Sequence, residues 1–175
     1  MPADEGRPRE FFHGHGFDRI TGPEAGLVAD FREDLARRRA ELPLTGNLYE
    51  PRVRADFPGS ECLLPVNWLL LPERKFDYVL LRAQPGESFP RHRHGYGEEL
   101  YVVVAGEGTV FIGDEAHPAR RHDVFHIPAG ILHGYAASPD TTETFDILCI
   151  NAPAVDQDLR SRYWSVDVEE GEQTR

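Results

Sequence analysis

The chain has 175 residues, of which 40% are hydrophobic, and it carries a formal net charge of −11 at pH 7. That length fits one domain with a core large enough to be stable without disulfides. Binding to nucleic acid or to an anionic membrane surface needs clustered Lys and Arg, so we expect neither partner. Because the chain shows neither an apolar run of about 18 residues nor a signal peptide, we expect a cytoplasmic protein.

Residues 1–50 are predicted to form a polar arm followed by one amphipathic α-helix. The arm contains His13 and His15, which we interpret as surface residues because no acid stands beside them. Thr21 and Glu24 have the spacing of a capping box, and the helix they begin is expected to end near Pro43. Its apolar stripe, which must pack on another part of the protein, consists of Leu27, Val28, Phe31 and Leu35.

From residue 50 onward the pattern changes to short apolar runs separated by Pro and Gly turns. The predicted strands are Cys62–Leu71, Phe76–Ala83, Ser88–His94, Glu99–Val104, Thr109–Ile112, Val124–Ile127, Leu132–Ala136 and Thr144–Ile150. Short strands at this spacing are typical of an antiparallel sandwich or barrel. We therefore predict an all-β domain over residues 51–154, followed by an acidic tail over residues 155–175.

A cluster of metal-ligand residue types lies in the middle of this domain. His92 and His94 are two residues apart on a predicted strand, so their side chains point to the same face. A Gly-rich turn follows, and Glu99 on the next strand can then face the two histidines. The segment Ile127–His133, which reads IPAGILH, supplies a third histidine after a tight turn. Three imidazoles and one carboxylate suit Fe, Mn, Ni, Zn or Cu, and they leave coordination positions open for a substrate.

These two segments resemble the motifs of the cupin superfamily. The segment Gly86–Gly106 matches the first motif, G-x5-H-x-H-x4-E-x6-G, at all five fixed positions. The second motif, G-x5-P-x-G-x2-H-x3-N, is matched at Pro128, Gly130 and His133, whereas His122 and Ala137 depart from it. The resemblance covers roughly residues 60–152. It implies a double-stranded β-helix, also called a jelly-roll barrel, which is often dimeric.

Glu98 is an alternative to Glu99 as the carboxylate ligand. Both faces of the strand that follows are apolar, so alternation does not decide between them, but the distance to Gly106 in the motif selects Glu99. We therefore predict that His92, His94, Glu99 and His133 bind one divalent transition-metal ion, with Fe(II) preferred. A strand that is apolar on both faces needs an outer cover. The N-terminal helix or a second subunit can provide it, and we expect a homodimer.

Several other residues are candidates for the site. Tyr101 lies two positions after Glu99 and should face the same cavity, so we predict Tyr101 and Glu99 as catalytic residues; the alternative for Tyr101 is core packing. His126 can enter the pocket or be structural, and the second role is favoured. Trp68 and Tyr78 are favoured as core residues over substrate contacts. The cysteines, Cys62 and Cys149, form no CxxC pair and are expected to be buried thiols.

The ligand set favours an enzyme that acts on a small organic substrate. We predict a non-haem iron oxygenase, because cupins with three histidines and one glutamate include dioxygenases as well as decarboxylases, lyases and isomerases. A non-redox isomerase, lyase or cyclase is the first alternative, since residues 99–108 resemble the E-x-Y-x4-G-x-G run of cupin-type sugar-phosphate isomerases. A non-catalytic cupin that binds a small molecule is the second.

Overall fold

The computed structural model describes residues 19–21, 45–57, 59–65, 75–94, 97–153 and 166–168. The predicted N-terminal helix, the His13/His15 pair and Trp68 lie outside these residues. No helix long and apolar enough to cross a membrane is found in the described part of the chain.

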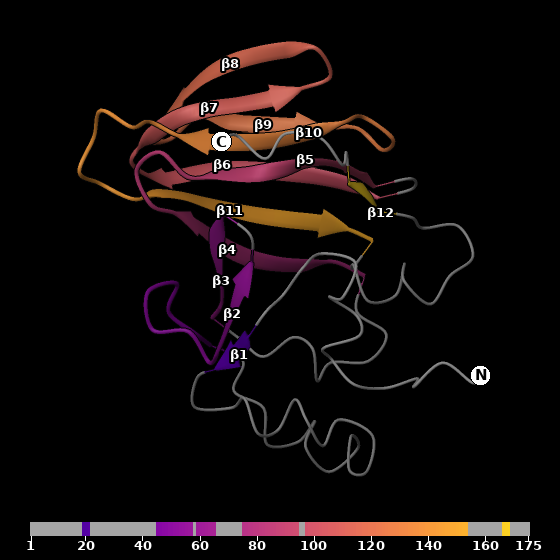
Figure 1. The fold of residues 1–175 in the computed structure, drawn as a ribbon. Coiled ribbons are helices and arrows are strands. Elements are labelled where there is room, and N and C mark those ends of the chain that lie inside the picture. The colour runs from indigo at the N-terminus through magenta and orange to yellow at the C-terminus, as the bar shows by residue number, and fades with distance from the viewer. Residues whose placement is uncertain are drawn as a thin grey trace.

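The described residues form two antiparallel sheets that face each other, as predicted for an all-β fold (Figure 1). The larger sheet has the order β1-β2-β3-β4-β11-β6-β9 and the smaller one β12-β5-β10-β7-β8. The strands of the larger sheet are β1 (Arg19–Thr21), β2 (Val53–Phe57), β3 (Ser60–Leu64), β4 (Asp77–Ala83), β11 (Phe145–Ala152), β6 (Glu98–Ala105) and β9 (Val124–Ile127). Those of the smaller sheet are β12 (Val166–Val168), β5 (Ser88–His94), β10 (His133–Ala137), β7 (Glu107–Ile112) and β8 (Glu115–Arg120).

Two of these strands, β2 and β8, lie within the predicted barrel but were not predicted as strands. β8 has no apolar alternation because it is an edge strand, and most of its side chains are exposed. Its proline, Pro118, is tolerated because a strand at an edge need not donate every backbone hydrogen bond. The predicted strand Cys62–Leu71 is described only as far as Leu64, where β3 ends.

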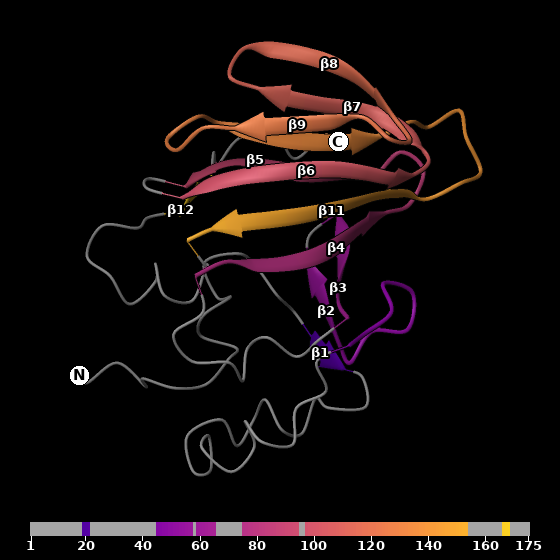
Figure 2. The ribbon, with the colours of Figure 1, turned by 180° about the vertical axis from the view of Figure 1, so that it is seen from behind.

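The core lies between the inner faces of the two sheets. In the ribbon seen from behind, β11 and β4 continue the larger sheet beyond β6 (Figure 2). Alternate residues of each strand point into this space, as period-two geometry requires. The largest fully buried side chains include Tyr101, Tyr135 and Phe145. Tyr135 can be buried because its hydroxyl hydrogen-bonds Ser60 Oγ at 2.6 Å.

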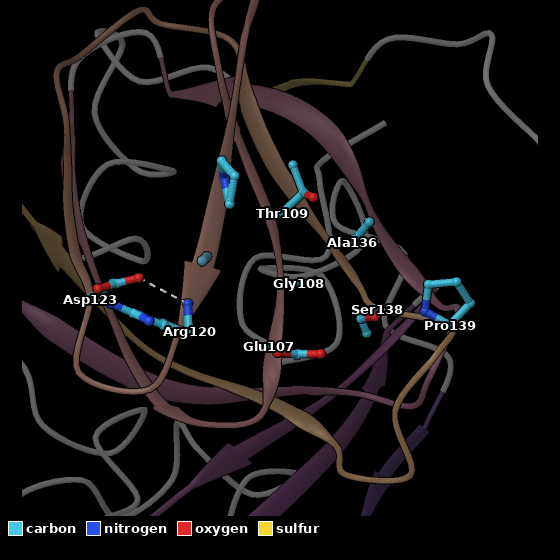
Figure 3. Close-up of a pocket in the computed structure, with 11 residues that line it drawn as sticks. Glu107, Gly108, Thr109, Arg120, Asp123, Ala136, Ser138 and Pro139 are labelled. Atoms are coloured by element: carbon cyan, nitrogen blue, oxygen red, sulfur yellow. Dashed lines mark hydrogen bonds between the residues drawn. The ribbon is translucent and has the colours of Figure 1, made fainter.

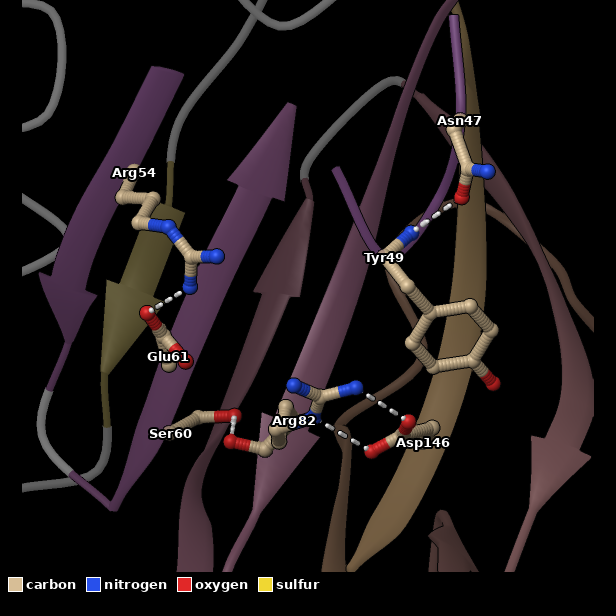
Figure 4. A network of polar contacts seen from close by, with 7 residues as sticks. All are labelled: Asn47, Tyr49, Arg54, Ser60, Glu61, Arg82 and Asp146. Atoms are coloured by element: carbon tan, nitrogen blue, oxygen red, sulfur yellow. Dashed lines mark hydrogen bonds and ion pairs between the residues drawn. The ribbon is translucent and has the colours of Figure 1, made fainter. Parts of the chain in front are cut away.

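The outer face of the larger sheet carries a paired charge network (Figure 4). The Arg82 guanidinium donates two hydrogen bonds to the Asp146 carboxylate, at 3.0 and 2.8 Å. The Tyr49 ring lies 5.3 Å from the same guanidinium, in cation–π geometry. Beside this network, Leu100 and Val102 of β6 are half-buried on the outer face, so this strand is apolar on both faces as predicted. The homodimer that we expect from this strand stays a prediction.

Candidate metal centre

Three strands from both sheets bring the predicted ligands together. β5 contributes His92 and His94, β6 contributes Glu99, and β10 contributes His133. His133 pairs directly with His92 in the ladder between β10 and β5, so these rings are neighbours on one inner face. All four side chains are buried, and their ligand atoms lie within 4.8 Å of one another.

Backbone carbonyls set the orientation of two of the three imidazole rings. His92 Nδ1 donates to the carbonyl oxygen of Pro90 at 3.0 Å, and His133 Nδ1 donates to that of Ile131 at 2.8 Å. A carbonyl oxygen can only accept, so the proton must be on Nδ1 in both rings. Nε2 of each ring is then the ligand nitrogen, an arrangement that recurs at metal-binding histidines.

The Glu99 carboxylate lies between two of the rings. Its Oε1 is 2.7 Å from His94 Nε2, and its Oε2 is 2.8 Å from His133 Nε2. Burial by itself raises the pKa of the Glu99 carboxyl, but His94 and His133 outweigh it and hold the pKa well below its usual range. Glu99 is therefore ionised at neutral pH, as a metal ligand must be.

The two histidines of the β5–β10 pair have pKa values shifted in opposite directions. Burial, together with the neighbouring His133 and His94, lowers the pKa of His92 well below its ordinary value. Burial also lowers the pKa of His133, but the Glu99 carboxylate beside it more than compensates and raises it. A proton and a metal ion would thus compete for the Glu99–His133 pair, whereas His92 is neutral and ready to bind.

The donor set fits one transition-metal ion. Metal–nitrogen bonds are about 2.0–2.1 Å long, so ligand atoms on opposite sides of an ion are about 4 Å apart. A cluster whose donors all lie within 4.8 Å of one another needs only small shifts to close around such an ion. His133 Nε2 and Glu99 Oε2 are also fully buried without a hydrogen bond of good geometry, and a shared ion would satisfy both. The cluster can therefore hold one metal ion.

Tyr101 lies beside the cluster, as its spacing from Glu99 predicts. It is 1% exposed, and its ring centroid is 5.9 Å from that of His133. Burial raises the pKa of the Tyr101 hydroxyl well above its ordinary value, and the negative charge of the nearby Glu99 adds to this effect. The hydroxyl consequently keeps its proton and acts as a donor.

Three polar residues near the cluster were missed by the sequence analysis as site residues. Asn151 of β11 stands directly opposite Glu99, and Asp77 of β4 stands opposite Asn151. Cys149 of β11, which was expected only as a buried thiol, is 3% exposed, and its Sγ lies 3.8 Å from Asn151 Oδ1. The available signal was a pair of polar residues, Cys149 and Asn151, at alternate positions of an otherwise apolar strand.

The remaining candidates lie away from the cluster. Glu98 is exposed and pairs with exposed His126 at 2.9 Å, on the outer face of the larger sheet. His126 therefore does not enter the site. Tyr78 is on the face of β4 opposite to Asp77 and Val79, which are on the inner face.

A groove of about 740 Å³ opens at the other end of the barrel (Figure 3). Its lining includes Glu107 at the start of β7, Arg120 at the end of β8 and Ser138 after β10. The cluster lies at the opposite end, since His133 begins β10, where it pairs with Ile112 at the end of β7 and with His92 of β5. The groove is thus separated from the cluster by the apolar core and is not its substrate cavity.

Two facing antiparallel sheets with a buried cluster of three histidines and one glutamate define a metal-binding double-stranded β-helix. Residues 79–151 match the family model of the cupin domain, so this part of the chain is a cupin domain. The matched residues run from β4 to β11 and include all four residues of the cluster.

Solved structures of other proteins are similar to this fold. The nucleoside dehydratase Pac13 from Streptomyces is 17% identical with a TM-score of 0.56, over 75% of this chain and 97% of that one. A sugar phosphate isomerase from Silicibacter pomeroyi is 20% identical with a TM-score of 0.50, over 65% and 67% of the two chains. At these identities the likeness shows the fold alone.

A curated relative matches over a shorter stretch. The HTH-type transcriptional activator RhaR of Mannheimia succiniciproducens is 40% identical over 47 residues, which are 27% of this chain. The chain spans only 17% of the length of that relative.

Proposed function

We propose that this protein is a metal-dependent enzyme that acts on a small organic molecule, and that it is a non-haem iron oxygenase. The observation that carries the proposal is the convergence of four buried donors, His92, His94, Glu99 and His133, within 4.8 Å. When bound, the ion would supply Lewis acidity and, if it is iron, redox chemistry at the positions that these ligands leave open. Zn, Mn, Ni and Cu bind the same donors, so the choice of Fe(II) is the finer part of the proposal.

The residues below the cluster keep water away from the bound substrate. The ring of Phe89 lies 5.1 Å from that of His92 and stacks on Tyr135 at 5.2 Å. Phe145 packs edge-on against Tyr135 further down the barrel, with ring centroids 6.0 Å apart. These aromatic rings close the inner end of the site, and a water-poor site strengthens each electrostatic interaction within it.

A second candidate is a non-redox isomerase or lyase, and the position of Tyr101 favours it. Its hydroxyl is buried, and burial raises its pKa well above the ordinary value, so it is protonated at neutral pH. A hydroxyl that keeps its proton beside the cluster is suited to donate a hydrogen bond to negative charge that develops on a substrate oxygen, which is chemistry that needs no O₂.

The two candidates are separated by metal analysis and an oxygen-dependence assay. The purified protein should contain about one iron per chain, and it should consume O₂ with a substrate from a panel of small acids and phenols. The His94→Ala variant should lose the iron and the activity together. Turnover that persists without O₂ in Zn- or Mn-loaded protein would replace the oxygenase with the isomerase or lyase. Tight binding without turnover under any metal would instead support a small-molecule binding cupin.

A further inference from the structure

The strand that supplies two of the metal ligands is paired on both of its sides. β5 pairs with β10 on one side and with β12, the short C-terminal strand, on the other (Figure 1). β12 is the last strand in the order of the smaller sheet, so β5 would be the edge strand of that sheet without it. The pairing of β12 therefore decides whether the backbone edge of the ligand strand is covered or open to water.

The register of this pairing places β12 directly beside the two ligands. The opposed residues are Val166 and His94, Asp167 and Arg93, and Val168 and His92. Ladder hydrogen bonds fix the backbone of paired residues, and the side chains of a metal site must be held to within about 0.5 Å of their working geometry. Pairing with β12 therefore supports the positions from which His92 and His94 reach the cluster.

β12 is held weakly for a strand in such a position. It has three residues, whereas strands in globular proteins usually have about five or six, and β5 is its neighbour in the described sheet. Short strands at a sheet edge open more readily than the central strands of a core. A modest change in free energy can therefore shift β12 between a docked and a released state.

One pair of opposite charges favours the docked state. Arg93 is half-buried on β5, and within the described part of the chain its Nε is buried without a hydrogen-bond partner. Arg91 differs, because its guanidinium donates to the carbonyl oxygen of Gly113. The residue opposite Arg93 in the ladder is Asp167, and opposite charges at directly paired positions stabilise an antiparallel ladder. The ligand strand and the C-terminal strand are thus complementary in charge where they pair.

We propose that β12 is a strap whose docking on β5 is coupled to metal binding by His92 and His94. The inference rests on the proposed function, because it requires that the cluster binds a metal ion. The docked strap holds the ligand strand through its backbone, and a bound ion holds the same strand through its side chains. Each event then favours the other by linkage, so retention of the metal depends on the C-terminal segment of the chain.

Paired proline substitutions in the full chain test the backbone part of this coupling. Successive amides of a strand point to opposite edges, so Val166→Pro/Asp167→Pro removes an amide that faces β5, whichever of the two it is. The Co(II) affinity of this variant, measured by competition with a chromophoric chelator, should fall by at least about 5-fold. In the wild-type protein, Co(II) should slow the hydrogen exchange of the β12 amides, which mass spectrometry of peptic fragments measures.

Charge reversal provides an independent test. In Arg93→Glu and in Asp167→Lys the paired positions carry like charges, whereas the double variant restores opposite charges. The double variant should bind Co(II) at least about 3-fold more tightly than the product of the two single effects predicts. The direct effect of each charge on the bound cation cancels in this comparison, because it is present in the single and in the double variant.

The matched control for this cycle is Asp140→Lys. It makes the same change of charge as Asp167→Lys at an exposed position between β10 and β11. Combined with Arg93→Glu, it should give the product of the two single effects, since Asp140 is not paired with Arg93.

The possible results separate the strap from the metal centre. Wild-type Co(II) affinity in a folded Val166→Pro/Asp167→Pro variant, or hydrogen exchange of β12 that Co(II) does not change, would overturn the strap alone. If that variant does not fold by circular dichroism, the charge-reversal cycle decides, and independent effects of Arg93→Glu and Asp167→Lys would overturn the proposal. A wild-type protein that binds no Co(II) would overturn the proposed metal centre and, with it, this inference.

Discussion

His92 and His133 face each other across β5 and β10, and each ring donates from Nδ1 to the carbonyl oxygen two residues before it. The orientation of these two rings is therefore fixed by the backbone of their own strands. The Glu99 carboxylate instead lies against side chains of two other strands, with His94 Nε2 at 2.7 Å and His133 Nε2 at 2.8 Å. His92 and His133 are therefore held by the backbone, and the orientation of the carboxylate depends on its neighbours.

Replacement of Glu99 should abolish tight metal binding, whereas replacement of Glu98 should not. Glu99→Gln removes the only anionic donor of the cluster, so we expect metal affinity to fall by at least about 100-fold. Glu98→Gln is the matched control, because this exposed side chain pairs with exposed His126 and not with the cluster. Metal content per chain, measured after dialysis, checks both variants. Equal metal loss in the two variants would contradict the assignment of Glu99 as the ligand.

The two glycines of the first motif should tolerate substitution very differently. Both have positive φ, +70° at Gly106 and +81° at Gly86. A Cβ at Gly106 would lie 2.2 Å from the carbonyl oxygen of Thr144, whereas at Gly86 the nearest atom would be Pro139 Cβ at 3.8 Å. Gly86→Ala should therefore lower the free energy of unfolding by about 1–2 kcal/mol, which is the strain of a non-glycine residue in the left-handed backbone conformation. Gly106→Ala adds a backbone clash and should cost more than about 3 kcal/mol.

Urea denaturation of the two glycine variants measures this difference. A Gly106→Ala protein as stable as Gly86→Ala would show that the loop around Thr144 moves away without cost.

The ligand cluster was predictable because few residue types bind transition metals and strand alternation fixes which side chains share a face. His92 and His94 illustrate this, since their spacing alone gives a common inner face. Asp77 and Asn151 could not be placed in the same way. Each stands at the end of its strand, where polar residues are ordinary, and only the ladders of β11 with β4 and β6 bring them beside Glu99.

The strands followed the same rule. Seven strands were predicted to within two residues at each end, because at least one of their faces is buried. They are β4, β5, β6, β7, β9, β10 and β11. Strand β8 was missed because its edge position removes the apolar pattern on which the prediction depends. The N-terminal helix and the division into residues 1–50, 51–154 and 155–175 remain predictions.

Removal of Arg82 should destabilise the protein through the charge that it leaves behind. Asp146 is 1% exposed, and Arg82, with 20% of its side chain exposed, donates two hydrogen bonds to it. Loss of one partner of a buried ion pair lowers the free energy of unfolding by about 3–5 kcal/mol. Because Arg82 is partly exposed, we expect Arg82→Met to lower it by about 2–3 kcal/mol. The double variant Arg82→Met/Asp146→Leu should recover much of this loss, because no buried charge remains. A double variant less stable than Arg82→Met in chemical denaturation would contradict this explanation.

The buried tyrosines should limit stability at alkaline pH. Burial raises the pKa values of Tyr101 and Tyr135 well above the ordinary value of 10.0. When folding raises the pKa of a group, that group contributes its full stabilisation at any pH below its pKa in the unfolded chain. This contribution is lost as the pH rises through the pKa of the group in the folded protein. Stability should thus fall above about pH 10, where only the unfolded chain ionises these hydroxyls.

Tyrosinate absorbance and circular dichroism, followed together as the pH rises, measure this effect. Some of the six tyrosines should ionise only as the protein unfolds. Tyr101→Phe should raise the pH of that transition, because it removes one of the two deeply buried hydroxyls. Ionisation of all six tyrosines near pH 10 in a protein that is still folded would show that these two hydroxyls are accessible to solvent.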